Sequence, residues 1–153
     1  MPAGRREQAL VSQIDLMPSI LDLCGIPLPG SEWEDHDTPF ERGFEAPLNL
    51  RPGRSWKGLL DGSVDSIRDS VVIENDDPTS GYNARALVTA KHRLTIYPGT
   101  DHGELFDLQN DPGELHNLWY DPAHSELRSQ LLRKLLEDYS RCTPFYPIPP
   151  WNA

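Results

Sequence analysis

The hydrophobic pattern of this 153-residue chain changes its period near residue 121, and no other feature constrains the fold as strongly. Asp121 suits the N-cap of a helix, and Pro122 suits the first helical position. Beyond them, apolar side chains recur every three or four residues, at Leu127, Leu131, Leu132, Leu135, Leu136 and Tyr139. The pattern predicts a helix that ends near Arg141 and carries an apolar stripe, which needs a sheet face to pack on.

Before residue 121, the apolar residues occur in short runs that are separated by turn signals. Four of these runs predict strands, at residues 69–75, 84–90, 93–98 and 103–108. Only Lys91 and His92 separate the second run from the third, so these two should form a hairpin. Because short links favour antiparallel neighbours, the sequence predicts an α+β fold. We expect an antiparallel sheet of about four strands with the long C-terminal helix packed on it.

The N-terminal part predicts a short helix followed by a proline-rich loop. In the segment DLMPSILDLCG, Asp15 suits the N-cap, Pro18 lies in the first turn and Gly25 suits the position after the helix. Prolines crowd the stretch between Gly25 and Gly53, which indicates a long surface loop. Residues 53–62, GRSWKGLLDG, predict a single helical turn, and the tail 143–152 predicts an extended strap on the body of the protein.

Charge and composition exclude several classes of function. The chain has 14 Lys and Arg against 24 Asp and Glu, a net charge of −10, which disfavours nucleic acid as a partner. It has no apolar run long enough to predict a membrane span, and the first residues show no signal peptide. Cys24 and Cys142 lack the spacing of a zinc site, so we expect ordinary thiols. The sequence leaves the cellular compartment open.

The stretch TDHGELFDLQNDPGELHNLW, residues 100–119, raises the question of a metal site because it is rich in acidic residues and histidine. Its spacing does not match a calcium loop of the EF-hand type, and Asp101 with His102 cannot close a site alone. No serine-hydrolase, zinc-protease or phosphate-binding motif occurs in the chain. The histidines are predicted in loops, in turns or at a helix start: His36, His92, His102, His116 and His124. The sequence therefore predicts no catalytic residue and no metal ligand in this chain.

Three segments, in the same order, resemble the C-terminal part of the sulfatases, a family with an alkaline-phosphatase-like fold. LVSQIDLMPSILDLCGIPLP is similar to the pattern vs-x-x-D-l-x-P-T-l-l-d-l-a-G-i-x-x-P, with Ser19 in place of the usual Thr. GRSWKGLLDG resembles G-x-S-l-x-p-l-l-x-G. The segment from Arg85 to Pro122 is similar to R-x-v-r-T-x-x-y-K-y-i-x-y followed by E-L-Y-D-L-x-x-D-P-x-E-x-x-N-L. In that match Arg85 and Thr89 keep their places, Arg93 replaces Lys and Phe106 replaces Tyr.

The resemblance implies a sulfuric-ester hydrolase whose chemistry lies outside this chain. Sulfatases carry a C/S-x-P-x-R motif that yields formylglycine, together with side chains that hold a divalent cation, usually calcium. Neither Cys24 nor Cys142 is followed by x-P-x-R, and Asp101–His102–Gly103 precedes a predicted strand, so the family's metal role is not transferred to it. The resemblance implies that residues 1–60 end a catalytic-domain region and that residues 61–153 form a C-terminal subdomain. Its partners would be the missing N-terminal catalytic domain and, through it, a sulfate-ester substrate; no nucleic-acid or membrane partner is expected.

Two alternatives remain beside this hypothesis. One is a stand-alone, non-catalytic accessory or binding module, and the other is a phosphonate or phosphate-ester hydrolase of the same superfamily. In the resembling enzymes the small sheet borders the substrate cleft, which suggests candidate substrate-binding residues around the loop between the first two strands: Asn75, Asp76, Asp77, Tyr82, Arg85 and His102. The competing interpretation is a solvated loop in which Arg85 pairs with Glu74 or another acidic neighbour.

Overall fold

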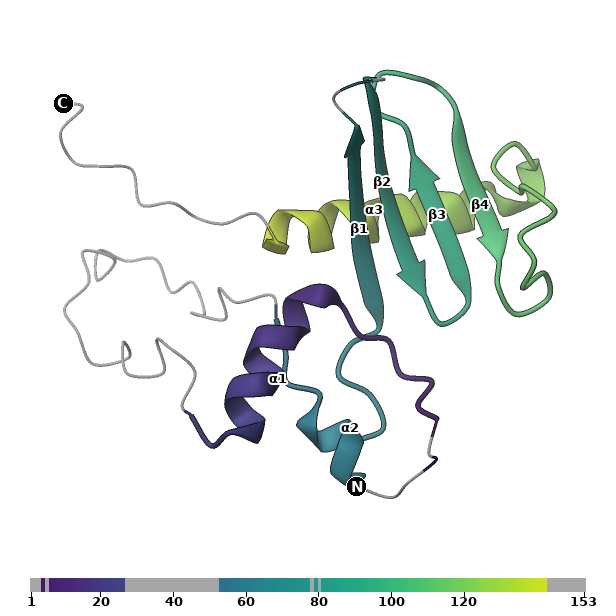
Figure 1. Ribbon diagram of the computed structural model, residues 1–153. Helices are drawn as coiled ribbons and strands as arrows, with labels where there is room; N and C mark the ends of the chain where they lie inside the picture. Colours follow the sequence, from purple (N-terminus) through teal and green to yellow (C-terminus); the bar gives the residue numbers. More distant parts are fainter. Residues whose placement is uncertain (1–3, 5, 27–52, 78, 80, 143–153) are drawn as a thin grey trace, which may run out of the picture.

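A four-stranded antiparallel meander with one long helix across its face forms the larger part of the computed structural model (Figure 1). The structure describes residues 4, 6–26, 53–77, 79 and 81–142, so the predicted proline-rich loop and C-terminal strap lie outside the described residues. The elements in chain order are η1 (Gln13–Asp15), α1 (Leu16–Leu23), α2 (Lys57–Asp61), β1 (Ser70–Asp77), β2 (Tyr82–Thr89), β3 (His92–Ile96), β4 (Gly103–Asp107), η4 (Pro122–His124) and α3 (Ser125–Cys142). This arrangement confirms the predicted α+β fold and the long C-terminal helix.

Each strand pairs with the next one along the chain, in the order β1-β2-β3-β4. The first hairpin is longer than predicted: Asp76 pairs with Asn83 and Asp77 with Tyr82, so residues outside the predicted strands extend β1 and β2. Asn and Asp are poor strand formers, and here the backbone pairing of the hairpin overrides that preference. His92, predicted in a link, is the first residue of β3 and pairs with Asp107.

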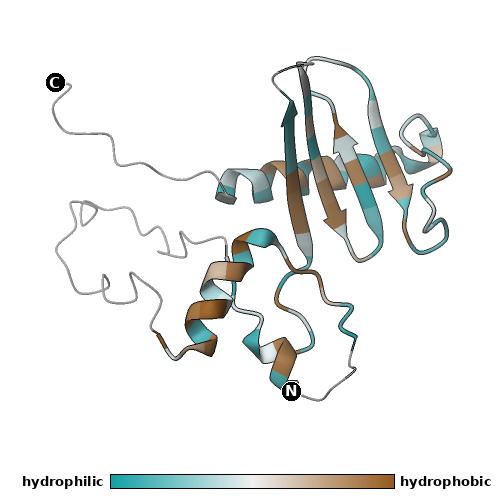
Figure 2. Ribbon diagram, in the orientation of Figure 1, coloured by the Kyte–Doolittle hydropathy of each residue, from teal (hydrophilic) through white to brown (hydrophobic). Residues whose placement is uncertain are grey.

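The core lies between one face of the sheet and α3. Leu87, Leu94 and Leu105 are fully buried on neighbouring strands, and Leu131 and Leu135 of α3 pack on them. Leu94 lies opposite both other strand leucines, so the three form a row across the sheet. Figure 2 shows apolar segments in the strands and in α3, which crosses one face of the sheet. The predicted helical stripe is confirmed in the core, except that Leu136 is 66% exposed.

The two edges of the sheet differ. Beyond β4, the Asn117 side chain accepts from the Leu105 N–H at 3.0 Å and donates to the Gly103 carbonyl at 3.1 Å. The Leu118 N–H donates to the Leu105 carbonyl at 2.8 Å. Residues 117–118 therefore take the place of a fifth strand beside Leu105 on this edge. Among the described residues, no strand pairs with the outer edge of β1.

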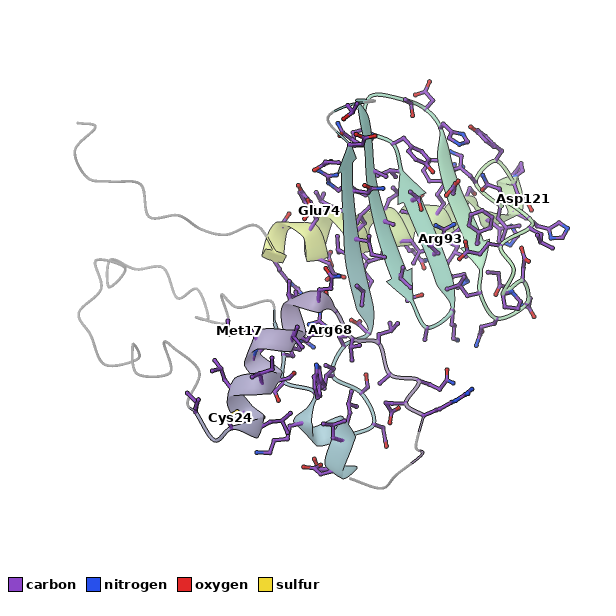
Figure 3. All side chains as sticks on the ribbon, in the orientation of Figure 1. Met17, Cys24, Arg68, Glu74, Arg93 and Asp121 are labelled. Atoms are coloured by element: carbon purple, nitrogen blue, oxygen red, sulfur yellow. The ribbon has the colours of Figure 1, made fainter. Side chains whose placement is uncertain are left out.

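A buried carboxylate joins the N-terminal helices to the segment before β1. Asp15 is 0% exposed, and its carboxylate accepts from the backbone N–H groups of Ser12 at 2.7 Å and Arg54 at 2.8 Å, and from the Arg68 guanidinium. Figure 3 shows Arg68 beside α1. Asp15 occupies the predicted N-cap position of α1, but its side chain turns back to Ser12 and inward and makes no capping hydrogen bond to that helix. Gly25, with φ of +68°, ends α1 as predicted.

Candidate functional site

All six candidate substrate-binding residues lie at one end of the sheet. In an antiparallel meander, the end of β1, the start of β2, the end of β3 and the start of β4 share that end. We call it the hairpin end and define it by the β1–β2 hairpin, residues 75–85, and the β3–β4 turn, residues 97–102. Figure 1 shows it at the top of the sheet. The meander therefore brings His102 to the same end as the five candidates of the first hairpin, with β3 between them.

The hairpin residues divide between the two faces of the sheet. Side chains alternate along a strand, so Asp76 and Arg85 point to the face that α3 covers, whereas Asn75 and Asp77 point to the opposite face. Asp77 accepts a hydrogen bond from the Thr79 N–H at 2.9 Å, which holds the tip of the hairpin. The candidate residues of this hairpin therefore do not converge on one point.

Arg85 is held by acidic neighbours on its own face. Its guanidinium donates to both carboxylate oxygens of Asp76, at 2.6 and 3.1 Å, and lies 3.4 Å from the Glu74 carboxylate. It also lies 5.8 Å from the ring centre of Tyr139 on α3. The bond from Arg85 lowers the pKa of Asp76 and, in return, Asp76 raises the pKa of Arg85. The pairing that the competing interpretation expected is present, and a substrate anion would have to displace Asp76 to reach this guanidinium.

A pocket of about 300 Å³ lies beside Arg85, between the sheet and α3. Ile96 and Leu132 contribute apolar walls, and Tyr139 lies at the end that is near Arg85. Its walls are mainly apolar, and the guanidinium of Arg85 is the charged group among the lining residues. The pocket suits an apolar group better than a charged one.

His102 belongs to an aromatic cluster that sequence analysis did not predict. Its ring stacks on Tyr97, with centroids 5.3 Å apart and planes inclined by 16°. Its Nδ1 lies 3.0 Å from the hydroxyl of Tyr120, which comes from the segment before η4. We call Tyr97, His102 and Tyr120 the aromatic cluster. The local sequence shows Tyr97 and Tyr120 as aromatic residues near turns, but it does not predict that they contact His102. That contact depends on the path of residues 108–120.

Contacts of the Trp119 side chain fix the path of residues 108–120. A Cβ atom on Gly103 would lie 2.5 Å from the Trp119 ring, so the indole packs directly on the backbone at the start of β4. The indole N–H donates to the Asp101 carbonyl at 3.3 Å. On the other side, the guanidinium of Arg128 lies 5.3 Å from the ring centre and donates to the Trp119 carbonyl. Tyr120, the next residue, is thereby brought against His102.

Acidic side chains in the stretch 107–117 hold its turns. Asp107 accepts hydrogen bonds from Asn110 and from the Gln109 N–H, and the Asn110 side chain is the main cause of its lowered pKa. Asp111 accepts from the His116 N–H at 2.8 Å, a bond that lowers its pKa in the same way. In the part of the chain that the structure describes, no group of three or more His, Cys, Asp or Glu side chains is placed to hold a metal ion. The same part contains no helix that is both long and apolar enough to span a membrane.

Comparison with known proteins places this geometry in a family. The model of the family described as "N-sulphoglucosamine sulphohydrolase, C-terminal" matches residues 41–141. The Delta 4,5-hexuronate-2-O-sulfatase of Bacteroides thetaiotaomicron is 27% identical over 129 residues, which cover 82% of this chain and 23% of the relative. The endo-4-O-sulfatase of the same organism is 30% identical over 138 residues, which cover 86% of this chain and 26% of the relative.

Solved structures agree with the sequence relatives. A 2-O GAG sulfatase aligns with a TM-score of 0.62 and 27% identity, over 82% of this chain and 23% of its own. A phosphonate monoester hydrolase from Silicibacter pomeroyi aligns with a TM-score of 0.65 and 26% identity, over 90% of this chain and 26% of its own. The chain thus spans about a quarter of the length of these four proteins. It belongs to the sulfatase family, as a C-terminal domain of the N-sulphoglucosamine sulphohydrolase type.

Proposed function

We propose that this chain is the C-terminal part of a sulfatase, where it supports a catalytic domain and borders the substrate cleft. The observation that carries the proposal is the family match over residues 41–141 in a chain that spans about a quarter of its sulfatase relatives. The remaining three quarters of such a relative would supply the catalytic domain. The activity therefore belongs to the longer protein, and the 153-residue chain alone should be inactive.

An apolar surface on α1 supports a large partner of this kind. Leu16, Met17, Ile20 and Leu23 are each about half exposed, so one side of this short helix presents a continuous apolar face. Figure 2 shows this face on α1, and Figure 3 places Met17 on it. The buried side of α1, at Pro18 and Ser19, already packs on the segment around Gly53 and Trp56. The proposed occupant of the exposed face is the catalytic domain of the same protein.

The cofactors of the proposed parent enzyme would be formylglycine and a divalent cation, for which we propose calcium. The described residues do not fit either group, because they contain no metal-binding cluster and Cys24 is not followed by the x-P-x-R sequence. Asp101 and His102 do not close a metal site by themselves, and the Nδ1 of His102 already contacts the Tyr120 hydroxyl. The residues that bind the metal and attack sulfur would all come from the catalytic domain.

The proposed substrate is a sulfate ester of a saccharide. Support comes from the names of the relatives, a hexuronate-2-O-sulfatase, an endo-4-O-sulfatase and a GAG sulfatase. A second candidate, hydrolysis of a phosphonate or phosphate ester, is favoured by the alignment with the phosphonate monoester hydrolase.

A chimera tests the proposal. In the endo-4-O-sulfatase relative, this chain replaces the matching C-terminal part, and turnover of 4-nitrophenyl sulfate is compared with that of the truncated relative. We expect truncation to abolish turnover and the chimera to restore it. A chimera that carries Met17→Asp and Ile20→Asp should not regain turnover. A chimera that is soluble, folded and inactive would contradict the supporting role. Turnover of a phenyl phosphonate without turnover of the sulfate would favour the second candidate.

The isolated chain provides the complementary measurement. It should not hydrolyse 4-nitrophenyl sulfate with or without added calcium. It should bind a fluorescent dye that reports exposed apolar surface, and Met17→Ser with Ile20→Ser should weaken that binding. Metal-dependent turnover by the isolated chain would show that its own residues form an active site.

A further inference from the structure

The aromatic cluster forms an exposed and firmly held surface at the hairpin end. Tyr120 is 65% exposed and His102 is exposed, although each is fixed by the 3.0 Å contact between the imidazole and the phenol. Tyr97 supports the His102 ring from one side, at 5.3 Å between centroids. Exposed aromatic rings usually rotate freely, so a ligand that binds them must restrict their motion. Here that restriction is already built into the fold.

The backbone beneath the cluster is held equally well. The Thr100 hydroxyl and N–H both donate to the Tyr97 carbonyl, at 2.9 and 3.1 Å. Gly99, with φ of +86°, adopts the left-handed conformation that this turn requires. The packing of Trp119 on Gly103 fixes the other side. The spacing between the aromatic rings is therefore set before any ligand arrives.

The charges around the cluster limit which ligands can bind there. Asp101 adjoins His102, and Asp76 and Asp77 lie at the same end of the sheet on β1, three strand spacings from β4, or about 14 Å across the sheet. Arg85 at this end is paired with Asp76 and Glu74, and the Arg128 guanidinium, which lies on the Trp119 ring, donates to the Trp119 carbonyl. A sulfate or phosphate group would be repelled here, whereas carboxylates accept hydrogen bonds from hydroxyl groups.

We propose that Tyr97, His102 and Tyr120 form a binding subsite for an uncharged, hydroxyl-bearing sugar ring. The negative face of an aromatic ring attracts the weakly positive C–H face of a pyranose, and the Tyr120 hydroxyl and the free Nε2 side of His102 supply polar contacts at the rim. This inference rests on the proposed function and deepens it. The subsite binds a neutral sugar that neighbours the sulfated one, and the sulfate ester itself binds in the catalytic domain.

A titration of the full 153-residue chain tests the proposal without any catalytic domain. The probes are diacetylchitobiose, a neutral disaccharide, and N-acetylglucosamine 6-sulfate, and the readout is the backbone amide spectrum by NMR. We expect diacetylchitobiose to shift amides 97–103 and 119–120 with a millimolar dissociation constant, and the sulfated sugar to bind at least threefold more weakly. No shift at 20 mM diacetylchitobiose, shifts centred elsewhere, or tighter binding of the sulfated sugar would overturn the proposal.

Variants separate a binding surface from a purely structural cluster. Tyr120→Ala should weaken diacetylchitobiose binding about fivefold, equivalent to ~1 kcal/mol, and His102→Ala should do the same if Tyr120→Ala does not fold. Tyr120→Phe keeps the ring and should stay within about twofold. Leu115→Ala, at a residue that is 80% exposed outside the cluster, is the matched control and should not change binding. If folded Tyr120→Ala and His102→Ala bind as tightly as the wild type, the cluster is only structural.

The failure of this inference can be told apart from the failure of the proposed function. In the chimera with the endo-4-O-sulfatase, the probe 4-nitrophenyl sulfate has no sugar, so its turnover does not depend on the proposed subsite. An active chimera with no amide shifts in the isolated chain would overturn the subsite and keep the sulfatase role. An inactive chimera, together with clear amide shifts in the isolated chain, would overturn the sulfatase role and keep the subsite.

Discussion

Replacing Asp15 with Asn should release the N-terminal helices from the segment that precedes β1. The buried carboxylate compensates the Arg68 guanidinium and accepts from two backbone N–H groups, those of Ser12 and Arg54. An amide has one oxygen in place of two and no charge, so the Arg68 side chain, only 10% exposed, would keep its charge and lose its ion pair with residue 15. Removing one partner of a buried ion pair costs about 3–5 kcal/mol.

Amide hydrogen exchange measures this loss locally. The N–H groups of Arg54 and Trp56, which donate to Asp15 and Ser19, should exchange about 10²–10⁴-fold faster in Asp15→Asn, because each 1.4 kcal/mol is a factor of ten. The Leu87 amide in the sheet should keep its protection. Asp65→Asn, at an exposed carboxylate, is the matched control. Exchange at Arg54 and Trp56 within threefold of the wild type would refute the argument that Asp15 joins these segments.

Three further predictions concern the sheet and its turns. Leu94→Ala removes a fully buried side chain from the centre of the leucine row, and urea unfolding should show a loss of about 3–5 kcal/mol; a loss below 1 kcal/mol would contradict the core assignment. Gly103→Ala should lower the free energy of unfolding by about 1–3 kcal/mol and shift the Trp119 emission, because the new methyl group collides with the indole. Adding Trp119→Leu to Gly103→Ala should relieve the collision, because the Leu side chain is smaller. The pKa of Asp107 is lowered in the folded state, so its contribution to stability is present above the unfolded value near pH 4 and is lost as the pH falls through the folded value. The urea midpoint should therefore fall between pH 5 and pH 2, and Asp107→Asn should flatten this dependence; a midpoint that rises on acidification would contradict it.

The fold could be predicted where the sequence carries a strong local signal. Leucines at helical spacing predicted α3, and short links between β-branched runs predicted the meander. The full length of the first hairpin could not be predicted, because Asp76 and Asp77 disfavour strands and join β1 only through pairing with β2. Asp15 suits an N-cap locally, and its actual partners include Arg54 and Arg68, which are distant in the sequence. Local rules cannot anticipate such partners.

The candidate site shows the same limit. The meander topology was enough to bring His102 and Arg85 to one end of the sheet, since topology follows from the order of the strands. Their immediate surroundings depend on side-chain packing. Tyr120 meets His102 across 18 residues because the Trp119 indole rests on a glycine, and the sequence gives no local sign of that contact. The pairing of Arg85 with Glu74 was foreseeable as a cross-strand neighbour.

The two edges of the sheet differ in how open they are to strands from other molecules. Residues 117–118 occupy the hydrogen-bonding groups of Leu105, so a strand from another molecule cannot add beside β4 there. Along β1, a copy added in parallel and in register would bring Glu74, Asp76 and Asp77 close to their own counterparts, and like charges at this spacing repel. Acid conditions neutralise these carboxylates, and that same edge then becomes the surface most open to fibre-like self-assembly.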